Sequence, residues 1–424
     1  MSHWWDRFTG ERALALWAGL FAFFMAPAIS IAYFCLGFLA LTTMVVWARQ
    51  RRWPKLQDLP LLWPLALYAA WGLVSSFCGI GPDRSLRYWR SDLLCLAFWL
   101  FYWLFDQEPR VRRWATRGFT LSVALLALSG LFQFIVINWA PSINEWLSGS
   151  SIAWVKKFAM LSQHGGRVHG PMHTMTYAEV MSLSGLFVIG FMYRRRWLGM
   201  TLGVLSLAAL LASGTRGPTL GFVAGVFVIG LGYSWFYRKI AWKVILPLSV
   251  SCMVLLFSPF VWARLRTAFE PESNRDRLVM WRVGARIIRD YPITGVGVAH
   301  IRTSWPSYFE KEWTVYLPYG QEVWSDVHSL YLQQAGERGI PGLLILVVLF
   351  GSMTWRCVKN LLADDRHRDL HLSTLAVIIG FWFVNLTESA FQDTEVVFVL
   401  YFILALAWSL VASKKSVPEG SSNV

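Results

Sequence analysis

Long apolar runs alternate with short basic segments along most of this chain. A helix needs about 17–25 predominantly apolar residues to cross a bilayer. Runs near that length fall at about 12–28, 30–48, 59–79, 90–106, 117–138, 174–193, 197–214, 217–236, 241–260, 340–356, 372–390 and 395–413. The pattern predicts an all-α polytopic membrane protein with about twelve transmembrane helices.

Two polar stretches, at about 139–173 and 261–327, are too long to be simple connections, and long ordered loops commonly carry function. They predict a helical domain inserted between helices 9 and 10. The expected organisation is 1–260 for helices 1–9 with a loop at about 139–173, 261–339 for a catalytic segment with amphipathic helices, 340–413 for helices 10–12, and 414–424 for a tail.

Composition agrees with a membrane location. Charged residues make up 15% of the chain, against about 25% in soluble proteins, and the mean hydropathy is +0.45. The 25 Trp and 14 Tyr suit aromatic belts at two membrane interfaces. The net charge of +14 therefore indicates loop Lys and Arg that meet inner-membrane lipids or phosphate, and not a nucleic-acid partner. The first run has no signal-peptide cleavage site.

The distribution of Lys and Arg predicts the orientation. With the N-terminus inside, the inner segments carry 22 of these residues and the short outer loops carry 7. Because cytoplasmic loops are enriched in Lys and Arg, we expect both termini in the cytoplasm. His328 and the stretch 261–327 would then face the periplasm of a Gram-negative cell.

The sequence offers no familiar cofactor site. There is no Walker loop, and "GVGVAH" (295–300) lacks the βαβ unit of a dinucleotide fingerprint. His164, His169 and His173 have few carboxylates nearby, and the five cysteines lack metal or disulfide spacing. We expect neither metal nor nucleotide, so an outward-facing enzyme would need a donor that arrives activated, such as a lipid-linked diphosphate sugar.

The stretch 273–290 predicts an amphipathic helix at the membrane surface, capped by Ser273 or Asn274. One stripe holds Arg275, Arg282, Arg286 and Arg289, which is typical of a solvated or headgroup-facing edge, and the expected apolar face holds Leu278, Trp281, Ala285 and Ile288. Arg277 projects on the packed side. It needs an anion there, either a phosphate or an internal partner such as Asp276 or Glu272.

Arg216 is the single charge in the tight turn "SGTRGPTL" (213–220). It either snorkels to water or presents its fork of donors to a lipid diphosphate. His328 is a candidate general base, because imidazole has a pKa near 6.5; on position alone it could equally be a polar interface residue. We expect it on a helix capped by Ser325 or Asp326 that breaks at Gly336–Gly342, which would explain the short run at 340–356.

Several motifs resemble those of the O-antigen ligase and polymerase superfamily. "HSLYLQQAGERGIPG" (328–342) is similar to its His-Asn/Ser-x-Tyr-Leu…Glu-x-Gly-x-x-Gly signature, with serine at 329 where many members have asparagine. "SGTRG" resembles its Ser-x-x-Arg-Gly turn. "RLVMW" (277–281) with "YPITGVG" (291–297) resembles its Arg-x-x-x-Trp…Pro-x-x-Gly-x-Gly segment. The ordered set runs from about 210 to 345.

The resemblance implies a GT-C-like inner-membrane glycosyltransferase that moves a glycan from undecaprenyl diphosphate to lipid A–core, without nucleotide or metal. It implies that Arg216 and Arg277 bind the diphosphate and that His328 is catalytic. From the residues themselves we add Arg167, in "HGGRVHG", as a further diphosphate ligand. We also predict that Arg84, Arg87 and Arg90, spaced i, i+3 and i+6, meet phosphates of the acceptor.

Other functions stay open. Within the superfamily these are an O-antigen polymerase and a protein O-oligosaccharyltransferase; the histidine-tyrosine signature favours a ligase. A transporter would place charges and broken helices at mid-membrane, whereas here Glu179 and Glu388 lie near outer helix ends. A scaffold without chemistry would not need arginines near one histidine.

Overall fold

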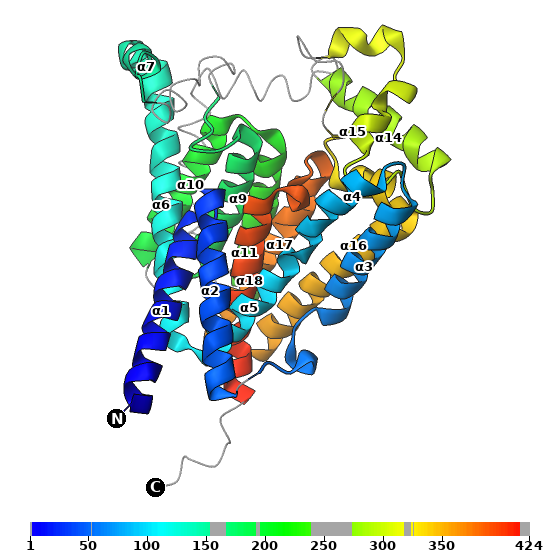
Figure 1. Ribbon diagram of the computed structural model, residues 1–424. Helices are drawn as coiled ribbons and strands as arrows, with labels where there is room; N and C mark the ends of the chain where they lie inside the picture. Colours follow the sequence, from blue (N-terminus) through cyan, green and yellow to red (C-terminus); the bar gives the residue numbers. More distant parts are fainter. Residues whose placement is uncertain are drawn as a thin grey trace.

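The protein is a bundle of long helices, seen in a computed structural model (Figure 1). The structure describes residues 2–51, 53–152, 167–191, 196–238, 274–317, 324 and 326–415. Its longer helices are α1 (Ser2–Phe24), α2 (Ile29–Gln50), α3 (Leu62–Cys78), α4 (Pro82–Trp89), α5 (Cys95–Gln107), α6 (Pro109–Trp139), α7 (Pro141–Ser148), α9 (Thr174–Phe191), α10 (Arg196–Ser213), α11 (Arg216–Tyr237), α14 (Arg275–Asp290), α16 (Leu330–Ala363), α17 (Arg368–Thr387) and α18 (Thr394–Lys415). Short helical turns include α15 (Ile301–Ser304), η2 (Arg90–Leu94), η6 (Trp305–Ser307), η7 (Lys311–Tyr316) and η9 (Ala390–Gln392).

Within the described ranges, six helices are long and apolar enough to cross a membrane: α2, α6, α11, α16, α17 and α18. Helix α3 and residues Trp197–Ser213 of α10 are apolar but shorter. The chain is therefore a multi-pass membrane protein. The count of about twelve spans stays a prediction, and the expected span 241–260 lies outside the described residues.

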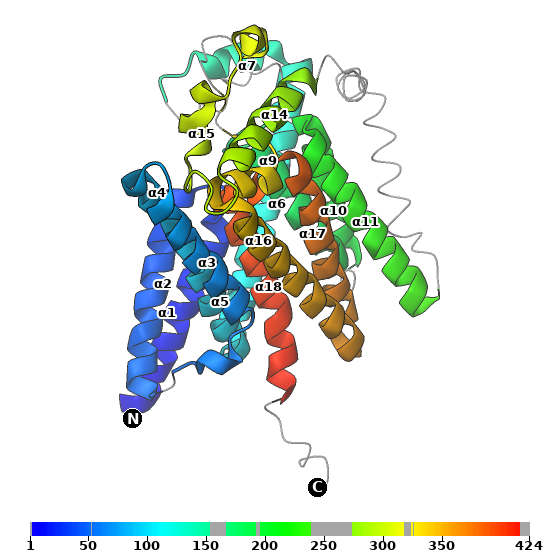
Figure 2. The ribbon, with the colours of Figure 1, turned by 90° about the vertical axis from the view of Figure 1, so that its right-hand side faces the viewer.

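The bundle has two different ends (Figures 1 and 2). Helix α1 begins and helix α18 ends at one end, while α4, α7, α14 and α15 lie at the other. This arrangement agrees with a topology in which both termini share one side and the segment before α16 lies on the opposite side.

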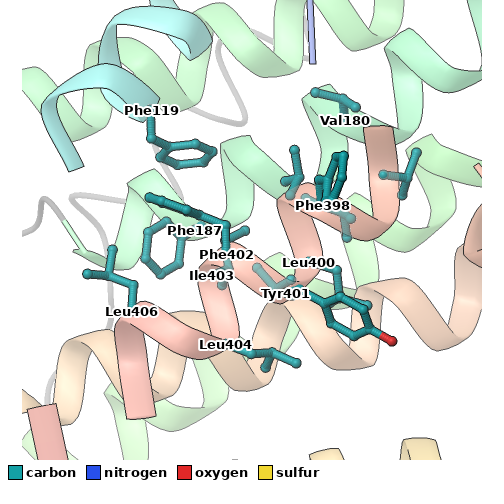
Figure 3. Packing of buried hydrophobic residues seen from close by; sticks show 14 of the residues in the cluster. Phe119, Val180, Phe187, Phe398, Leu400, Tyr401, Phe402, Ile403, Leu404 and Leu406 are labelled. Atoms are coloured by element: carbon teal, nitrogen blue, oxygen red, sulfur yellow. The ribbon is translucent and has the colours of Figure 1, made fainter. Parts of the chain in front are cut away.

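Helix α18 is the centre of the bundle. In its apolar stretch 78% of the residues are buried, against 22% in α2, which lies at the periphery. Phe402 of α18 packs against Phe119 of α6, which also contacts Phe187 of α9 (Figure 3). Tyr401 of α18 packs against Phe98 of α5. The outward faces of peripheral helices keep exposed apolar residues, as expected where lipid covers them.

A second hydrophobic cluster lies outside the bundle core. It joins α14 to the turns that follow and to the segment before α16, and its members include Val283, Ile287, Ile301, Trp305 and Val327. A region with its own core can hold its shape apart from its neighbours. The inserted domain, with its expected boundaries at 261 and 339, stays a prediction.

The glycines of "YPITGVG" bring the segment after α14 against α16. Gly295 and Gly297 have φ of 69° and 98°, values that favour glycine. The amide of Val296 donates to Gly336 O at 2.9 Å, and that of Gly297 donates to Glu337 O at 3.0 Å. A Cβ at Gly295 would clash with the backbone of Glu337. These glycines therefore allow the close contact that positions α14 above α16.

Two expectations about local structure are wrong and a third is confirmed. The run at 90–106 is divided between η2 and a short α5. His328 lies before α16 and not on it: Ser329 occupies the N-cap position, and Asp326 does not cap the helix. Ser325 lies outside the described residues. The expected break after the first part of α16 is present, because the backbone of Gly339 is non-helical (φ 71°) and kinks the 34-residue helix.

The amphipathic helix is present as α14, but a different face is buried. Val279, Met280, Val283, Gly284 and Ile287 are buried, whereas Leu278 is 46% exposed and Ala285 is exposed. The reason is that α14 rests on α16 and on Val327, which contacts the position of Gly284. The packing of neighbouring segments against α14 decides which face is buried. The face predicted from the apolar pattern is offset from the buried one by about one residue.

Candidate functional site

His328 lies in a strained turn between the second hydrophobic cluster, which ends at Val327, and α16. Its φ is 47°, a left-handed conformation that is uncommon for a residue with a side chain. The carboxylate of Asp326 accepts the backbone N–H of His328 at 2.7 Å, and the side-chain oxygen of Gln333 accepts that of Val327 at 3.1 Å. These bonds hold the turn in the conformation that directs the imidazole toward the segment after α17.

Glu388 is the partner of that imidazole. Its Oε2 lies 3.2 Å from His328 Nδ1, and its carboxylate is only 3% exposed. A histidine that donates from Nδ1 to a carboxylate keeps Nε2 as its proton acceptor. The carboxylate therefore orients the ring for a role as a base.

The pKa values of this pair move in opposite directions. Burial opposes the charged imidazole, but the hydrogen bond to Glu388 and the negative charges of Asp326 and Glu388 raise the pKa of His328 above its usual 6.5. Burial likewise opposes the charged form of Glu388, yet the bond from His328 and the charge of Arg277 lower its pKa. The carboxylate stays ionised and stabilises an imidazolium beside it.

Arg277, near the start of α14, reaches the same carboxylate. Its guanidinium donates to Glu388 Oε1 at 2.9 Å and to the carbonyl of Thr387 at 2.8 Å. The arginine is 23% exposed, so it is neither free in solvent nor fully packed. It has the internal ion pair that a packed arginine needs, but the partner is Glu388 and not Asp276; Glu272 lies outside the described residues.

Arg216 lies on the adjoining turn between α10 and α11, and Arg167 bonds to that turn. Arg216, the first residue of α11, donates to the side chain of Asn274 at 2.8 Å, and Asn274 is the N-cap residue of α14. Arg167 donates to the carbonyl of Ser213 at 3.1 Å. This turn packs against the Glu388 segment, because a Cβ at Gly217 would lie 3.1 Å from Glu388 Cγ.

The structure therefore brings together four of the predicted residues. Arg277 and His328 share Glu388, Arg216 is tied to α14 beside Arg277, and Arg167 is tied to the turn that carries Arg216. We call this set, with Glu388, the arginine–histidine cluster. It lies at the end of the bundle opposite the start of α1.

The arginine–histidine cluster does not include Arg84, Arg87 or Arg90. These three side chains also have different surroundings and do not form one continuous surface. Arg84 is half-buried and lines an internal cavity. Arg87 and Arg90 are exposed, and Arg90 donates to the carbonyl of Arg87 at 3.1 Å. Helix α4 is followed directly by η2, so the expected regular spacing does not continue.

Sequence reasoning did not identify Glu388 as the common partner. The available signal was an acid near the end of an apolar run, but its contacts with His328 and Arg277 join residues 60 and 111 positions apart. It also missed the buried pair of Arg338 with Asp92. Within the described ranges, no group of three or more His, Cys, Asp or Glu side chains is arranged to hold a metal.

Comparison with known proteins adds one finding. Residues 201–347 match the family described as O-Antigen ligase. The match covers just over a third of the chain, from α10 to the middle of α16, and includes Arg216, Arg277 and His328. No curated protein matches the chain.

Proposed function

Because residues 201–347 match the family described as O-Antigen ligase, we propose that the chain is a glycosyltransferase of the inner membrane. It transfers O-antigen glycan from undecaprenyl diphosphate to a sugar hydroxyl of lipid A–core. The arginine–histidine cluster faces the periplasm, and both termini are cytoplasmic. This assignment combines the family, the charge asymmetry of the loops and the chemistry of the cluster.

One observation supports the proposal most strongly: a single buried carboxylate joins the base to an arginine. Glu388 accepts from His328 Nδ1 on one oxygen and from Arg277 on the other. In an inverting displacement the base deprotonates the hydroxyl on the face of the sugar opposite the leaving group, so the two protein groups must be held in a fixed relative position. Glu388 provides that fixed position, because it contacts both His328 and Arg277.

The proposed reaction is a displacement at the anomeric carbon. The acceptor hydroxyl gives its proton to His328 Nε2 as its oxygen bonds to that carbon. The bond from the carbon to the diphosphate oxygen breaks, and the diphosphate leaves with the electron pair. Arg216, Arg277 and Arg167 stabilise the developing charge, while Glu388 stabilises the imidazolium. A single displacement inverts the anomeric centre.

Removing the guanidinium of Arg277 should weaken binding of the donor. Each charge-assisted hydrogen bond contributes about 1.5–3 kcal/mol, so Arg277→Ala or Arg216→Ala should raise the donor Kd by roughly 10- to 100-fold. Arg277→Lys should recover only part of the affinity, because lysine lacks the planar fork. Binding of a diphosphate-linked glycan to purified protein measures this effect.

The exposed Arg282 of α14 provides the matched control, because Arg282→Ala removes an equal charge from the same helix. Thermal unfolding of each variant identifies any loss of folding. This control is needed because Arg277→Ala removes the ion-pair partner of the buried Glu388. Unchanged donor affinity in both Arg216→Ala and Arg277→Ala would assign these arginines to packing.

The pH dependence should respond to Glu388. A base acts in its neutral form, so the rate rises with pH through the raised pKa of His328. Glu388→Gln removes the negative charge that helps to raise this pKa, so the acidic limb of the kcat/KM profile should move to lower pH. A limb that stays in place would show that another group is the base.

A transfer assay tests the function. Vesicles that contain the protein, a synthetic undecaprenyl diphosphate glycan and rough lipopolysaccharide should form capped lipopolysaccharide without ATP or added metal. Lengthening of the lipid-linked glycan would instead indicate a polymerase, and labelling of an added protein would indicate a protein O-oligosaccharyltransferase. Movement of the donor across the membrane without transfer would indicate a transporter.

A further inference from the structure

A cavity of about 300 Å³ lies beside the arginine–histidine cluster and is separate from it. Neither His328 nor the three arginines of the cluster line it, but Asp326 does. The same Asp326 accepts the backbone N–H of His328 and lies 3.5 Å from its Nδ1. Asp326 therefore borders the cavity and also contacts the proposed base. The volume of the cavity falls at the lower end of the range for small-molecule sites.

The mouth of the cavity carries positive charge and an aromatic ring. Arg84 is half-buried, while Arg302 and Tyr88 are exposed. The guanidinium of Arg84 lies 5.6 Å from the centroid of the Tyr88 ring. Its Nε is buried, and within the described part of the chain it has no hydrogen-bond acceptor. A buried donor without an acceptor is costly, and an anionic ligand would supply one.

The inner wall of the cavity has the polar groups that bind hydroxyls. Gln333 donates to one oxygen of Glu337 at 2.6 Å, and Gln392 donates to the other at 3.1 Å. These side chains line the cavity together with Asp326. Neighbouring amides and carboxylates over an apolar floor that includes Phe391 and Tyr401 suit a sugar ring, which is polar at its edge and apolar on its faces.

We propose that this cavity binds a phosphorylated sugar of the acceptor, an inference that rests on the proposed transferase function. Arg84 and Arg302 bind the phosphate, and the amides and carboxylates of the wall bind the hydroxyls. Asp326, which lines the cavity and bonds to the backbone of His328, then holds the acceptor site and the base next to each other. The donor diphosphate thus binds at the arginine–histidine cluster and the acceptor phosphate binds in the cavity. His328 lies between these two sites.

Arg84→Ala and Arg302→Ala test this subsite, with Arg87→Ala as the matched control on the same helix. Arg87 is exposed and does not line the cavity, so the proposed subsite, in contrast to the sequence-based prediction, does not include it. With saturating donor, the two cavity variants should raise the acceptor KM by roughly 10- to 100-fold and leave the donor KM unchanged. The increase should vanish when the acceptor oligosaccharide has been treated with phosphatase.

Direct binding separates this proposal from the proposed function. Lipid-free phosphorylated core oligosaccharide and its dephosphorylated form are titrated into the purified, full-length His328→Ala protein, with and without Arg84→Ala. Phosphate-dependent binding that requires Arg84 supports the subsite even if no transfer occurs. Transfer by the wild type with equal acceptor affinity in Arg84→Ala and Arg87→Ala would overturn the subsite and leave the function standing. Because Arg302 is exposed, Arg302→Ala reports on the phosphate contact even if Arg84→Ala does not fold.

Discussion

Replacement of His328 should abolish transfer without preventing donor binding. General acid–base catalysis contributes about 10²- to 10⁴-fold, so His328→Ala should lower kcat by that factor. His328→Gln should be as inactive, because an amide can still donate to Glu388 but cannot accept the proton of a hydroxyl. The arginines remain in place in both variants, so the donor Kd should stay near that of the wild type.

His367→Gln is the control for this pair. His367 pairs with Asp364, 2.9 Å away, beyond the far end of α16 from His328. The measurement is kcat with a fixed diphosphate glycan and acceptor, alongside the donor Kd. If His328→Gln transferred glycan at the wild-type rate, His328 would not be the base. If it lost donor binding instead, His328 would be part of the donor site.

Asp92→Ala should strongly destabilise the protein. Arg338, in the first part of α16, makes a bidentate ion pair with Asp92 of η2, at 2.7 and 2.8 Å. The two side chains are 3% and 5% exposed, and the Arg338 guanidinium lies 4.4 Å from the centroid of the Tyr68 ring. Loss of one partner leaves an unpaired buried charge, which costs about 3–5 kcal/mol. The melting temperature in detergent should fall accordingly.

Asp83→Ala, which removes an exposed acid from neighbouring α4, should melt like the wild type. A double replacement of Asp92 and Arg338 by leucine and methionine should recover part of the lost stability, because it removes both charges. Equal melting temperatures for Asp92→Ala and Asp83→Ala would show that this pair does not hold η2 to α16.

Much of the bundle could be predicted because apolar runs of bilayer length have few alternatives to helix. Helices α9, α11, α17 and α18 lie within a few residues of the predicted runs. The sequence-based prediction was wrong where contacts between distant segments determine which face of a helix is buried. The backbone of residues 296–297 bonds to carbonyls of α16, which fixes α14 above that helix. The buried face of α14 follows from that contact and not from its own pattern.

Only part of the candidate site could be predicted, because local sequence features mark single residues but do not show which distant residues meet. Arg216, Arg277 and His328 stood out because each is a polar group in an unusual local setting. Their convergence depends on Glu388, which lies after α17, and no local pattern connects it to α14 or to the turn of His328. The conformation of that turn was also hidden, because the bond from His328 to Asp326 competes with the helix that the sequence favours.

The account depends on the cluster being the place where the lipid-linked diphosphate binds. The most direct measurement is an experimental structure of the His328→Ala protein with a bound undecaprenyl diphosphate glycan. We predict that the phosphate oxygens lie within hydrogen-bond distance of the guanidinium groups of Arg216 and Arg277, with the anomeric carbon facing the position of the missing imidazole. A diphosphate bound elsewhere on the bundle, with Arg277 still held by Glu388 alone, would contradict it.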